Sequence, residues 1–311
     1  MAALIAPPPS ALEATYKVRE AEGVLDLYFY RKIGFQLAKF FAQLGMSPVA
    51  VTLLGGVFGI IAGHLYFYRN LGTNIIGMVL HVCANALDNA DGQLARLTGR
   101  TSRQGRIIDS VIDHLIFLNI YVHLTLRYLV HGASPAICLL AFAAGISHAL
   151  QGAAADYYRN AYFHFVRGRL RDRFDSSSDL RSNYRELEWR RHPWNKCLLA
   201  LYLNFTRQQE MLAPKLNRLR QAVARLSPPE LPERLRARYA ASAKPMFKLW
   251  GFLMTNTRML VLFALLFIGQ PVWYFWVELT VFNFLLIYLL VREQSMSQRL
   301  LEDVLAQRGP A

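Results

Sequence analysis

The chain has 311 residues, of which 54% are apolar and 13% aromatic, and its formal net charge is +14. This combination excludes an ordinary soluble core and argues against a nucleic-acid-binding protein, which would carry its basic face on a soluble domain. It favours an all-α integral membrane protein whose Lys and Arg lie in cytosolic loops that face membrane lipids. Cys83, Cys138 and Cys197 form no metal or disulfide pattern, and we expect them to be buried spacers.

The N-terminal region has two predicted parts. Residues 1–22 contain three consecutive prolines and no lasting periodicity, which predicts a tail, and they lack the order of residues typical of a secretory signal. Residues 25–45 place apolar side chains three or four positions apart with basic residues among them, which predicts an amphipathic helix in the membrane interface. A core helix of a soluble domain is the alternative.

Four apolar stretches follow. Residues 49–66 carry no formal charge and are long enough to cross a membrane. Residues 75–87 are shorter than about 18 residues, so they cross only if their helix continues through the acidic stretch that follows. Further spanning helices are expected at 106–130 and 134–155, the second continuing beyond the membrane. In the first stretch, small residues at four-residue intervals predict close helix packing rather than ligand contact, and these are Gly55, Gly59 and Gly63.

The second half of the chain contains an insertion and two more predicted spanning helices. Residues 249–291 are one apolar region broken by a strong turn signal at 269–271. Residues 167–248 are rich in Arg and predict a helical cytosolic insertion, whose charges either contact anionic lipid headgroups or only solvate it. The predicted parts are the tail at 1–22, the interfacial helix and first four spanning helices at 23–166, the insertion at 167–248, and the last two helices with a C-terminal tail at 249–311.

Loop charges give an orientation, because cytosolic loops retain Lys and Arg. The N-terminal arm, the connection at 96–106, the insertion and the C-terminus are basic. The other connections carry few charges, with Arg69 counted in one loop and mainly Arg127 and His131 in another. Six spanning helices with both ends in the cytosol fit this alternation. The acidic segment at 85–115 then lies at the cytosolic membrane surface.

That segment carries two pairs of aspartates between strongly apolar neighbours. Asp88 and Asp91 are three residues apart, and Asp109 and Asp113 are four apart, so each pair projects from one face of its helix. Two facing helices would gather four carboxylates, and such all-oxygen sites select hard ions such as Mg²⁺, Mn²⁺ or Ca²⁺. Ion pairs with loop arginines, or an ion site of a cation transporter, are the alternatives.

The joint spacing is more specific than either alternative requires. It reads Asp88-x2-Asp91-Gly92-x2-Ala95-Arg96-x8-Gly105-x3-Asp109-x3-Asp113. Every fixed position resembles the signature of the CDP-alcohol phosphatidyltransferase family. The six-helix plan with an interfacial helix extends the resemblance to most of the chain apart from the insertion.

The resemblance implies a six-helix membrane enzyme, generally a homodimer, that transfers a phospho-alcohol moiety from a CDP-linked donor to an acceptor hydroxyl and releases CMP. It implies that Asp88, Asp91 and Asp109 bind divalent metal, as two Mg²⁺ or Mn²⁺ ions. By the same resemblance, Asp113 is counted with them at the metal site and also acts as general base. The positions it assigns to the nucleotide are Asp88, Gly92, Ala95, Arg96 and Gly105.

One departure from the family pattern precedes the signature. Relatives often begin the first spanning helix with Pro-Asn-x-x-Thr, whereas this chain has Pro48 and Thr52 but no Asn between them. A nucleotide contact through that amide is therefore in doubt, and Thr52 either contacts the nucleotide or only packs at the helix start.

Within the family that the chain resembles, six helices rather than the larger number of the aminoalcohol enzymes imply CDP-diacylglycerol as donor. The acceptor is then a polar alcohol such as inositol phosphate or glycerol phosphate, with serine and free inositol left open. The alternative is a CDP-aminoalcohol donor with diacylglycerol or ceramide as acceptor. A phosphate-bearing acceptor needs further cations, although membrane anchoring explains the same residues, which are Arg159, Lys244, Lys248 and Arg258. We expect a bacterial inner (plasma) membrane location with the active site facing the cytosol.

Overall fold

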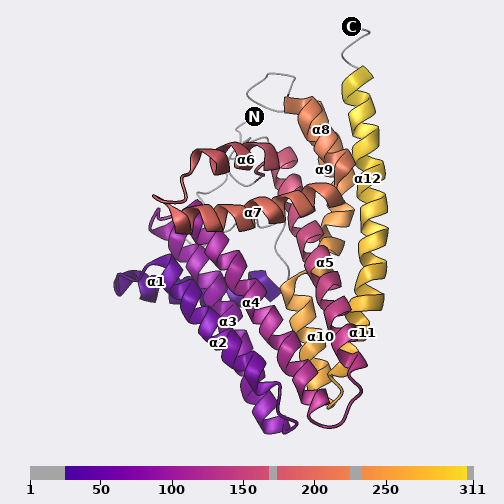
Figure 1. The fold of residues 1–311 in the computed structure, drawn as a ribbon. Helices are drawn as coiled ribbons and strands as arrows, with labels where there is room; N and C mark the ends of the chain where they lie inside the picture. The colour runs from indigo at the N-terminus through magenta and orange to yellow at the C-terminus, as the bar shows by residue number, and fades with distance from the viewer. Residues whose placement is uncertain (1–24, 168–173, 225–232, 307–311) are drawn as a thin grey trace, which may run out of the picture. The chain divides into compact units, whose positions relative to one another are not determined.

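The computed structural model describes residues 25–167, 174–224 and 233–306, so the expected tail at 1–22 lies outside the described residues. Every regular element in the described ranges is helical, and those ranges contain no strand (Figure 1), which confirms the all-α prediction. The chain divides into two compact units, residues 1–134 and 135–311. This boundary falls within the predicted 23–166 part, and the four predicted parts stay a prediction.

The first unit contains four long helices after a short π-helical turn, η3 (Asp26–Tyr30). They are α1 (Arg31–Gln43), α2 (Pro48–Leu65), α3 (Leu71–Leu97) and α4 (Arg103–Leu129). Side chains cap three of the N-termini: Ser47 accepts from the Ala50 amide of α2, Asn70 from Thr73 of α3, and Ser102 from Gly105 of α4. α3 continues unbroken through the acidic stretch, which is the condition under which the short apolar stretch 75–87 is expected to belong to a spanning helix.

Glycines on α2 allow close contact with its neighbours. A Cβ atom at Gly55 would lie 3.3 Å from Leu87 Cβ on α3, and one at Gly59 would lie 2.5 Å from Ile116 Cδ1 on α4. The predicted packing role of the small-residue stripe is therefore confirmed. Because α2 contacts both helices this closely, it fixes the distance between the faces that carry the aspartates.

The amphipathic helix α1 packs against the acidic part of α3. A Cβ atom at Gly34 would lie 3.2 Å from the backbone nitrogen of Ala90, and Gln93 donates to the carbonyl of Arg31 at 3.1 Å. Ala38 and Phe41 join the same apolar cluster as residues of α2 and α3. Burial raises the pKa of Tyr30 at the start of this helix. The location of α1 in a membrane interface stays a prediction.

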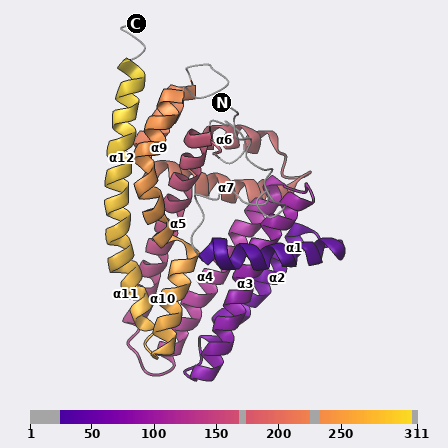
Figure 2. The same cartoon turned by 180° about the vertical axis from the view of Figure 1, so that it is seen from behind.

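The second unit begins with α5 (Ala136–Arg167) and continues through four helices in the predicted insertion (Figures 1 and 2). These are α6 (Ser177–Glu186), α7 (Pro193–Leu212), α8 (Pro214–Ala224) and α9 (Glu233–Trp250). The last part comprises η4 (Gly251–Leu253), α10 (Thr255–Phe267), α11 (Val272–Val277), η5 (Glu278–Phe282) and α12 (Asn283–Ala306). The predicted turn at 269–271 is confirmed between α10 and α11.

Five helices are long and apolar enough to cross a membrane, namely Pro48–Leu65, Leu71–Leu97, Arg103–Leu129, Ala136–Val166 and Val272–Ala306. α9 with η4 and α10 together are also long and apolar enough, but a break between η4 and α10 bends them by 41°. They make a sixth candidate span if the bent pair is counted as one. At 13 residues, α10 alone extends only about 20 Å. The described ranges therefore contain five or six candidate membrane spans, which supports an integral membrane protein.

Two sequence interpretations change with the structure. Cys138 and Cys197 are exposed rather than buried spacers, since each lies on the outer face of its helix. Arg127, counted as a loop charge, is buried in α4 and donates to the carbonyl of Tyr66 at 3.0 Å. It therefore satisfies the C-terminal end of α2, where carbonyl groups lack helical partners.

Candidate metal and nucleotide site

Three carboxylates converge between α3 and α4. Asp88 and Asp91 lie one turn apart on α3, and Asp109 lies in the second turn of α4. One oxygen atom from each side chain lies within 4.8 Å of the others. Asp91 is buried and Asp109 is half-buried. The structure thus brings together three of the four aspartates of the signature.

Thr52 connects the second turn of α2 to this group. Its buried hydroxyl donates a hydrogen bond to the Asp91 carboxylate, 39 positions later in the chain. A hydrogen bond to the ionised carboxylate favours the charged form that a metal requires. Thr52 therefore orients a carboxylate, and its predicted contact with the nucleotide stays a prediction.

The donor set fits a divalent metal ion. Oxygen atoms on opposite sides of one Mg²⁺ are about 4.2 Å apart and those around Ca²⁺ about 5 Å apart, so a spread of 4.8 Å needs little closure around a cation. All three donors are carboxylate oxygens, which hard ions prefer. Without a cation, the three negative charges would repel one another at this distance. Among the described residues, no other three His, Cys, Asp or Glu side chains converge in this way.

Asp113 lies one turn beyond Asp109 on α4, and its side chain is exposed. It does not belong to the three-carboxylate group. One helical turn of about 5.4 Å separates it from the group, which leaves room for a substrate hydroxyl between the carboxylate and the metal site. Its role as general base stays a prediction.

The remaining signature residues lie on the same two helices as the aspartates. A Cβ atom at Gly92 would lie 3.5 Å from both terminal guanidinium nitrogens of Arg96, so this arginine folds back over the glycine on α3. Gly105 lies in the first turn of α4, where its amide donates to the capping hydroxyl of Ser102 at 3.0 Å. Ala95 lies between them in sequence on the half-buried side of α3. The small side chains leave the backbone open beside a cationic group that suits phosphate.

The four predicted acceptor residues lie in the second unit and differ in environment. The Arg159 guanidinium carbon lies 4.9 Å from the ring centre of Phe247, and Lys244 and Lys248 are exposed on α9. Arg258 is only 1% exposed and contacts both carboxylate oxygens of Glu278 at 2.6 and 2.7 Å. This environment favours a structural role for Arg258.

Arg258 belongs to a buried polar network that the sequence interpretation did not identify. It also donates to Gln151 at 2.7 Å and to the Leu253 carbonyl at 3.1 Å, and His148 lies 3.4 Å from Glu278. The available signal was a charge of each sign within the apolar region 249–291. Buried charges in apolar surroundings need such partners.

Comparison with known proteins agrees with this geometry. Residues 46–162, which hold α2, α3, α4 and most of α5, match the CDP-alcohol phosphatidyltransferase family. This match confirms the resemblance drawn from the signature. The match ends before the insertion.

Two relatives share part of this region. The chain is 36% identical to phosphatidylinositol phosphate synthase of Streptomyces avermitilis over 110 residues, 35% of this chain and 44% of the relative. It is 36% identical to archaetidylinositol phosphate synthase of Pyrococcus horikoshii over 80 residues, 26% of this chain and 41% of the relative. The chain thus spans less than half the length of each of these relatives.

Proposed function

We propose that this protein is an enzyme that transfers a phosphatidyl group from CDP-diacylglycerol to the hydroxyl of a polar alcohol and releases CMP. The observation that carries the proposal is the convergence of Asp88, Asp91 and Asp109 within 4.8 Å, at the spacing of the family signature. The match of residues 46–162 to the family supports it.

The reaction requires a nucleophile, a leaving group and charge stabilisation. The acceptor oxygen forms a bond to the phosphorus that carries diacylglycerol, and the bond between that phosphorus and the CMP oxygen breaks. The acceptor proton passes to the Asp113 carboxylate as general base. Asp88, Asp91 and Asp109 would hold divalent metal, which when bound would neutralise charge on the diphosphate. Arg96 neutralises further phosphate charge, and Gly92 and Gly105 leave space for the nucleotide.

Inositol phosphate is the acceptor we favour, with glycerol phosphate as an alternative. The names of both relatives refer to inositol phosphate synthases. Arg159, Lys244 and Lys248 supply cations in the second unit that suit a phosphate-bearing acceptor. The buried pairing of Arg258 with Glu278 makes Arg258 a weaker candidate.

Two Mg²⁺ or Mn²⁺ ions at the aspartates, a homodimer, and a bacterial inner-membrane location with the site facing the cytosol complete the proposal. The exposed Lys and Arg residues of the insertion support the orientation.

A donor and acceptor matrix tests this function. Purified protein in lipid nanodiscs is given CDP-diacylglycerol, CDP-choline or CDP-ethanolamine with Mg²⁺ or Mn²⁺. The acceptor panel contains inositol phosphate, glycerol phosphate, inositol, serine, diacylglycerol and ceramide. We expect CMP release and a new phospholipid only with CDP-diacylglycerol and a phosphate-bearing alcohol. Turnover confined to CDP-aminoalcohols would support the alternative donor class, and cation flux without CMP release would support a transporter.

A further inference from the structure

One face of α7 presents an exposed apolar stripe. Trp194 is 64% exposed, Leu201 51% and Met211 79%, and Cys197 is exposed between the first two. Their spacing of three, four and ten residues places them along one side of the helix. Asn204 and Gln208 are the exposed polar members of the same stripe.

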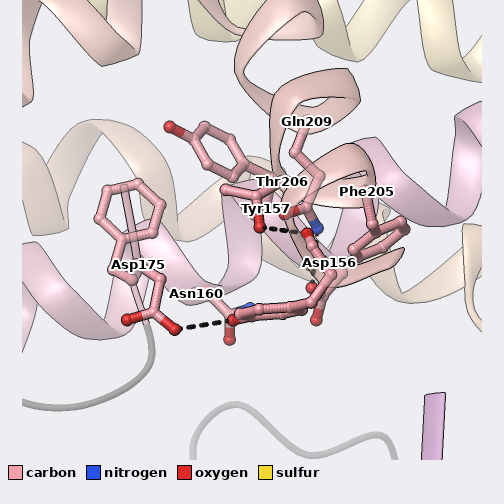
Figure 3. Close-up of a pocket in the computed structure, with 9 residues that line it drawn as sticks. Asp156, Tyr157, Asn160, Asp175, Phe205, Thr206 and Gln209 are labelled. Atoms are coloured by element: carbon pink, nitrogen blue, oxygen red, sulfur yellow. Dashed lines mark hydrogen bonds between the residues drawn. The ribbon is translucent and has the colours of Figure 1, made fainter. Parts of the chain in front are cut away.

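Contacts within the second unit place α7 beside the point where the apolar stretch of α5 ends and charged residues begin. Residues 136–155 of α5 carry no formal charge and are followed by Asp156, which accepts from Gln209 of α7 at 2.9 Å. Figure 3 shows this junction, with Asp156 and Asn160 of α5 beside Thr206 and Gln209 of α7 around a small polar cavity. α7 therefore crosses α5 at the end of its apolar part.

The C-terminal end of α7 contacts α12 at a similar boundary between apolar and charged residues. Gln294 of α12 donates to the carbonyl of Leu212, the last residue of α7, at 2.9 Å, and to the Tyr158 hydroxyl of α5 at 3.0 Å. The apolar part of α12 ends just before this contact, at Arg292 and Glu293. Since α7 crosses α5 and ends beside α12 (Figure 1), it lies along the boundary between the apolar and charged parts of these helices.

The packing of α6 shows which way the stripe faces. Leu199 and Leu203 of α7 cluster with Leu180 of α6. Leu201 lies two residues from each of them, which puts it on the opposite side of the helix at 3.6 residues per turn. α6 lies on the side of α7 away from the α10–α11 turn (Figures 1 and 2). The stripe is therefore directed toward the apolar parts of the spans.

The turn that connects α6 to α7 adds aromatic and basic groups. Trp189 is 53% exposed, and Arg190 and Arg191 are exposed between it and Trp194. Arg191 contacts Glu188 at 3.3 Å, but both side chains are largely in solvent, so this pair screens little of the charge. Tryptophans beside arginines are typical of the membrane interface, where anionic headgroups attract the arginines.

We propose that α7 is an interfacial anchor, with its stripe of Trp194, Cys197, Leu201 and Met211 immersed at the bilayer surface and Arg190 and Arg191 bound to anionic lipid headgroups. This surface lies in the insertion, outside the matched residues 46–162. It commits the exposed apolar face to lipid rather than to a second copy of the chain. It also assigns a specific part of the basic insertion to the membrane.

Cys197 provides a natural position for a spin label that measures depth. Full-length protein with Cys83→Ala and Cys138→Ala is labelled at Cys197 and reconstituted into phosphatidylcholine vesicles with or without phosphatidylglycerol. We expect the label to be more accessible to oxygen, which concentrates in lipid, than to a water-soluble nickel chelate. A label at Ser182→Cys with Cys197→Ala, on exposed α6, should show the reverse order. Labelling Leu201→Cys with Cys197→Ala should repeat the result along the stripe.

Charge removal tests the lipid class. The label at Cys197 should lose nickel accessibility when phosphatidylglycerol is added, and Arg190→Gln with Arg191→Gln should abolish that shift. Arg181→Gln with Arg234→Gln removes the same charge from exposed positions elsewhere and should preserve it. Nickel accessibility at Cys197 equal to that at Ser182→Cys would overturn the proposal. Protection from both reagents would indicate coverage by protein and would also overturn it. Equal depth in both vesicle types would refute the assignment to anionic lipid.

Discussion

The hydroxyl of Thr52 on α2 donates a hydrogen bond to the carboxylate of Asp91 on α3, inside the three-carboxylate group. This bond joins the start of α2 to the last two turns of α3. It leaves the carboxylate oriented toward Asp88 and Asp109. The metal site is therefore built by three helices, although its ligands come from two.

Thr52→Val should weaken metal binding. The substitution keeps the shape of the side chain but removes a buried hydrogen bond to an ionised group, which contributes about 1.5–3 kcal/mol. We expect the Mg²⁺ concentration for half-maximal CMP release to rise about 10- to 100-fold. Thr52→Ser keeps the hydroxyl and should stay near the wild type. An unchanged metal requirement in Thr52→Val would show that the hydrogen bond does not support the site.

Asp113→Asn should separate catalysis from binding. Because Asp113 lies outside the three-carboxylate group, the variant should retain metal-dependent binding of the CDP donor while turnover falls at least about 100-fold. Asp109→Asn alters a member of the group and should lose both properties. Calorimetric binding of CDP beside CMP release distinguishes them. Full turnover in Asp113→Asn would remove this residue as general base.

Gly59→Ala should destabilise the first unit. The new methyl group would lie 2.5 Å from Ile116 Cδ1, and overpacking of this kind costs about 1–3 kcal/mol. Thermal unfolding in detergent should show a lower midpoint, and adding Ile116→Ala should cost less than the sum of the two single changes. Gly152→Ala on α5 is the matched control, because nothing lies within 4 Å of its added Cβ atom. Equal midpoints for both alanine variants would contradict the close approach of α2 and α4.

Glu278→Gln should be more harmful than removing both partners of its ion pair. The single change leaves the Arg258 charge buried without its carboxylate, at a cost of about 3–5 kcal/mol. Arg258→Met with Glu278→Met removes both charges and should unfold at a higher temperature than Glu278→Gln. The double variant should keep the KM for the acceptor alcohol, since we assign Arg258 to packing. A raised KM with intact folding would return Arg258 to the acceptor site.

Helix periodicity and charge spacing predicted much of the site. The segment 75–87 was too short to span alone, and its continuation through Asp88 and Asp91 was needed to complete α3. The intervals of three and four residues predicted that the aspartates face one another, and this holds for Asp88, Asp91 and Asp109 but not for Asp113, which lies outside the group. The hydrogen bond of Thr52 did not follow, because it depends on the rotation of α2 against α3, which local spacing does not determine.

The second unit was less predictable for a related reason. Apolar content identified 249–291, but α10 ended up with only 13 residues and a bend before it. The pairing of Arg258 with Glu278 joins residues on different helices across an apolar run. Such contacts depend on tertiary packing, and a sequence window displays only two isolated charges. The exposed apolar face of α7 likewise depends on tertiary packing, because α6 covers the other side of that helix.

The most direct test of the central claim is CMP release from CDP-diacylglycerol and inositol phosphate by purified protein in nanodiscs, measured for the wild type and for Asp91→Asn. We expect metal-dependent release by the wild type that chelation abolishes and fresh Mg²⁺ or Mn²⁺ restores. Asp91→Asn, if folded with a wild-type unfolding midpoint, should lose at least about 100-fold in rate, because the metal contributes several kcal/mol of charge stabilisation. Metal-independent release, or an Asp91→Asn rate equal to that of the wild type, would contradict the assignment of these carboxylates to the active site.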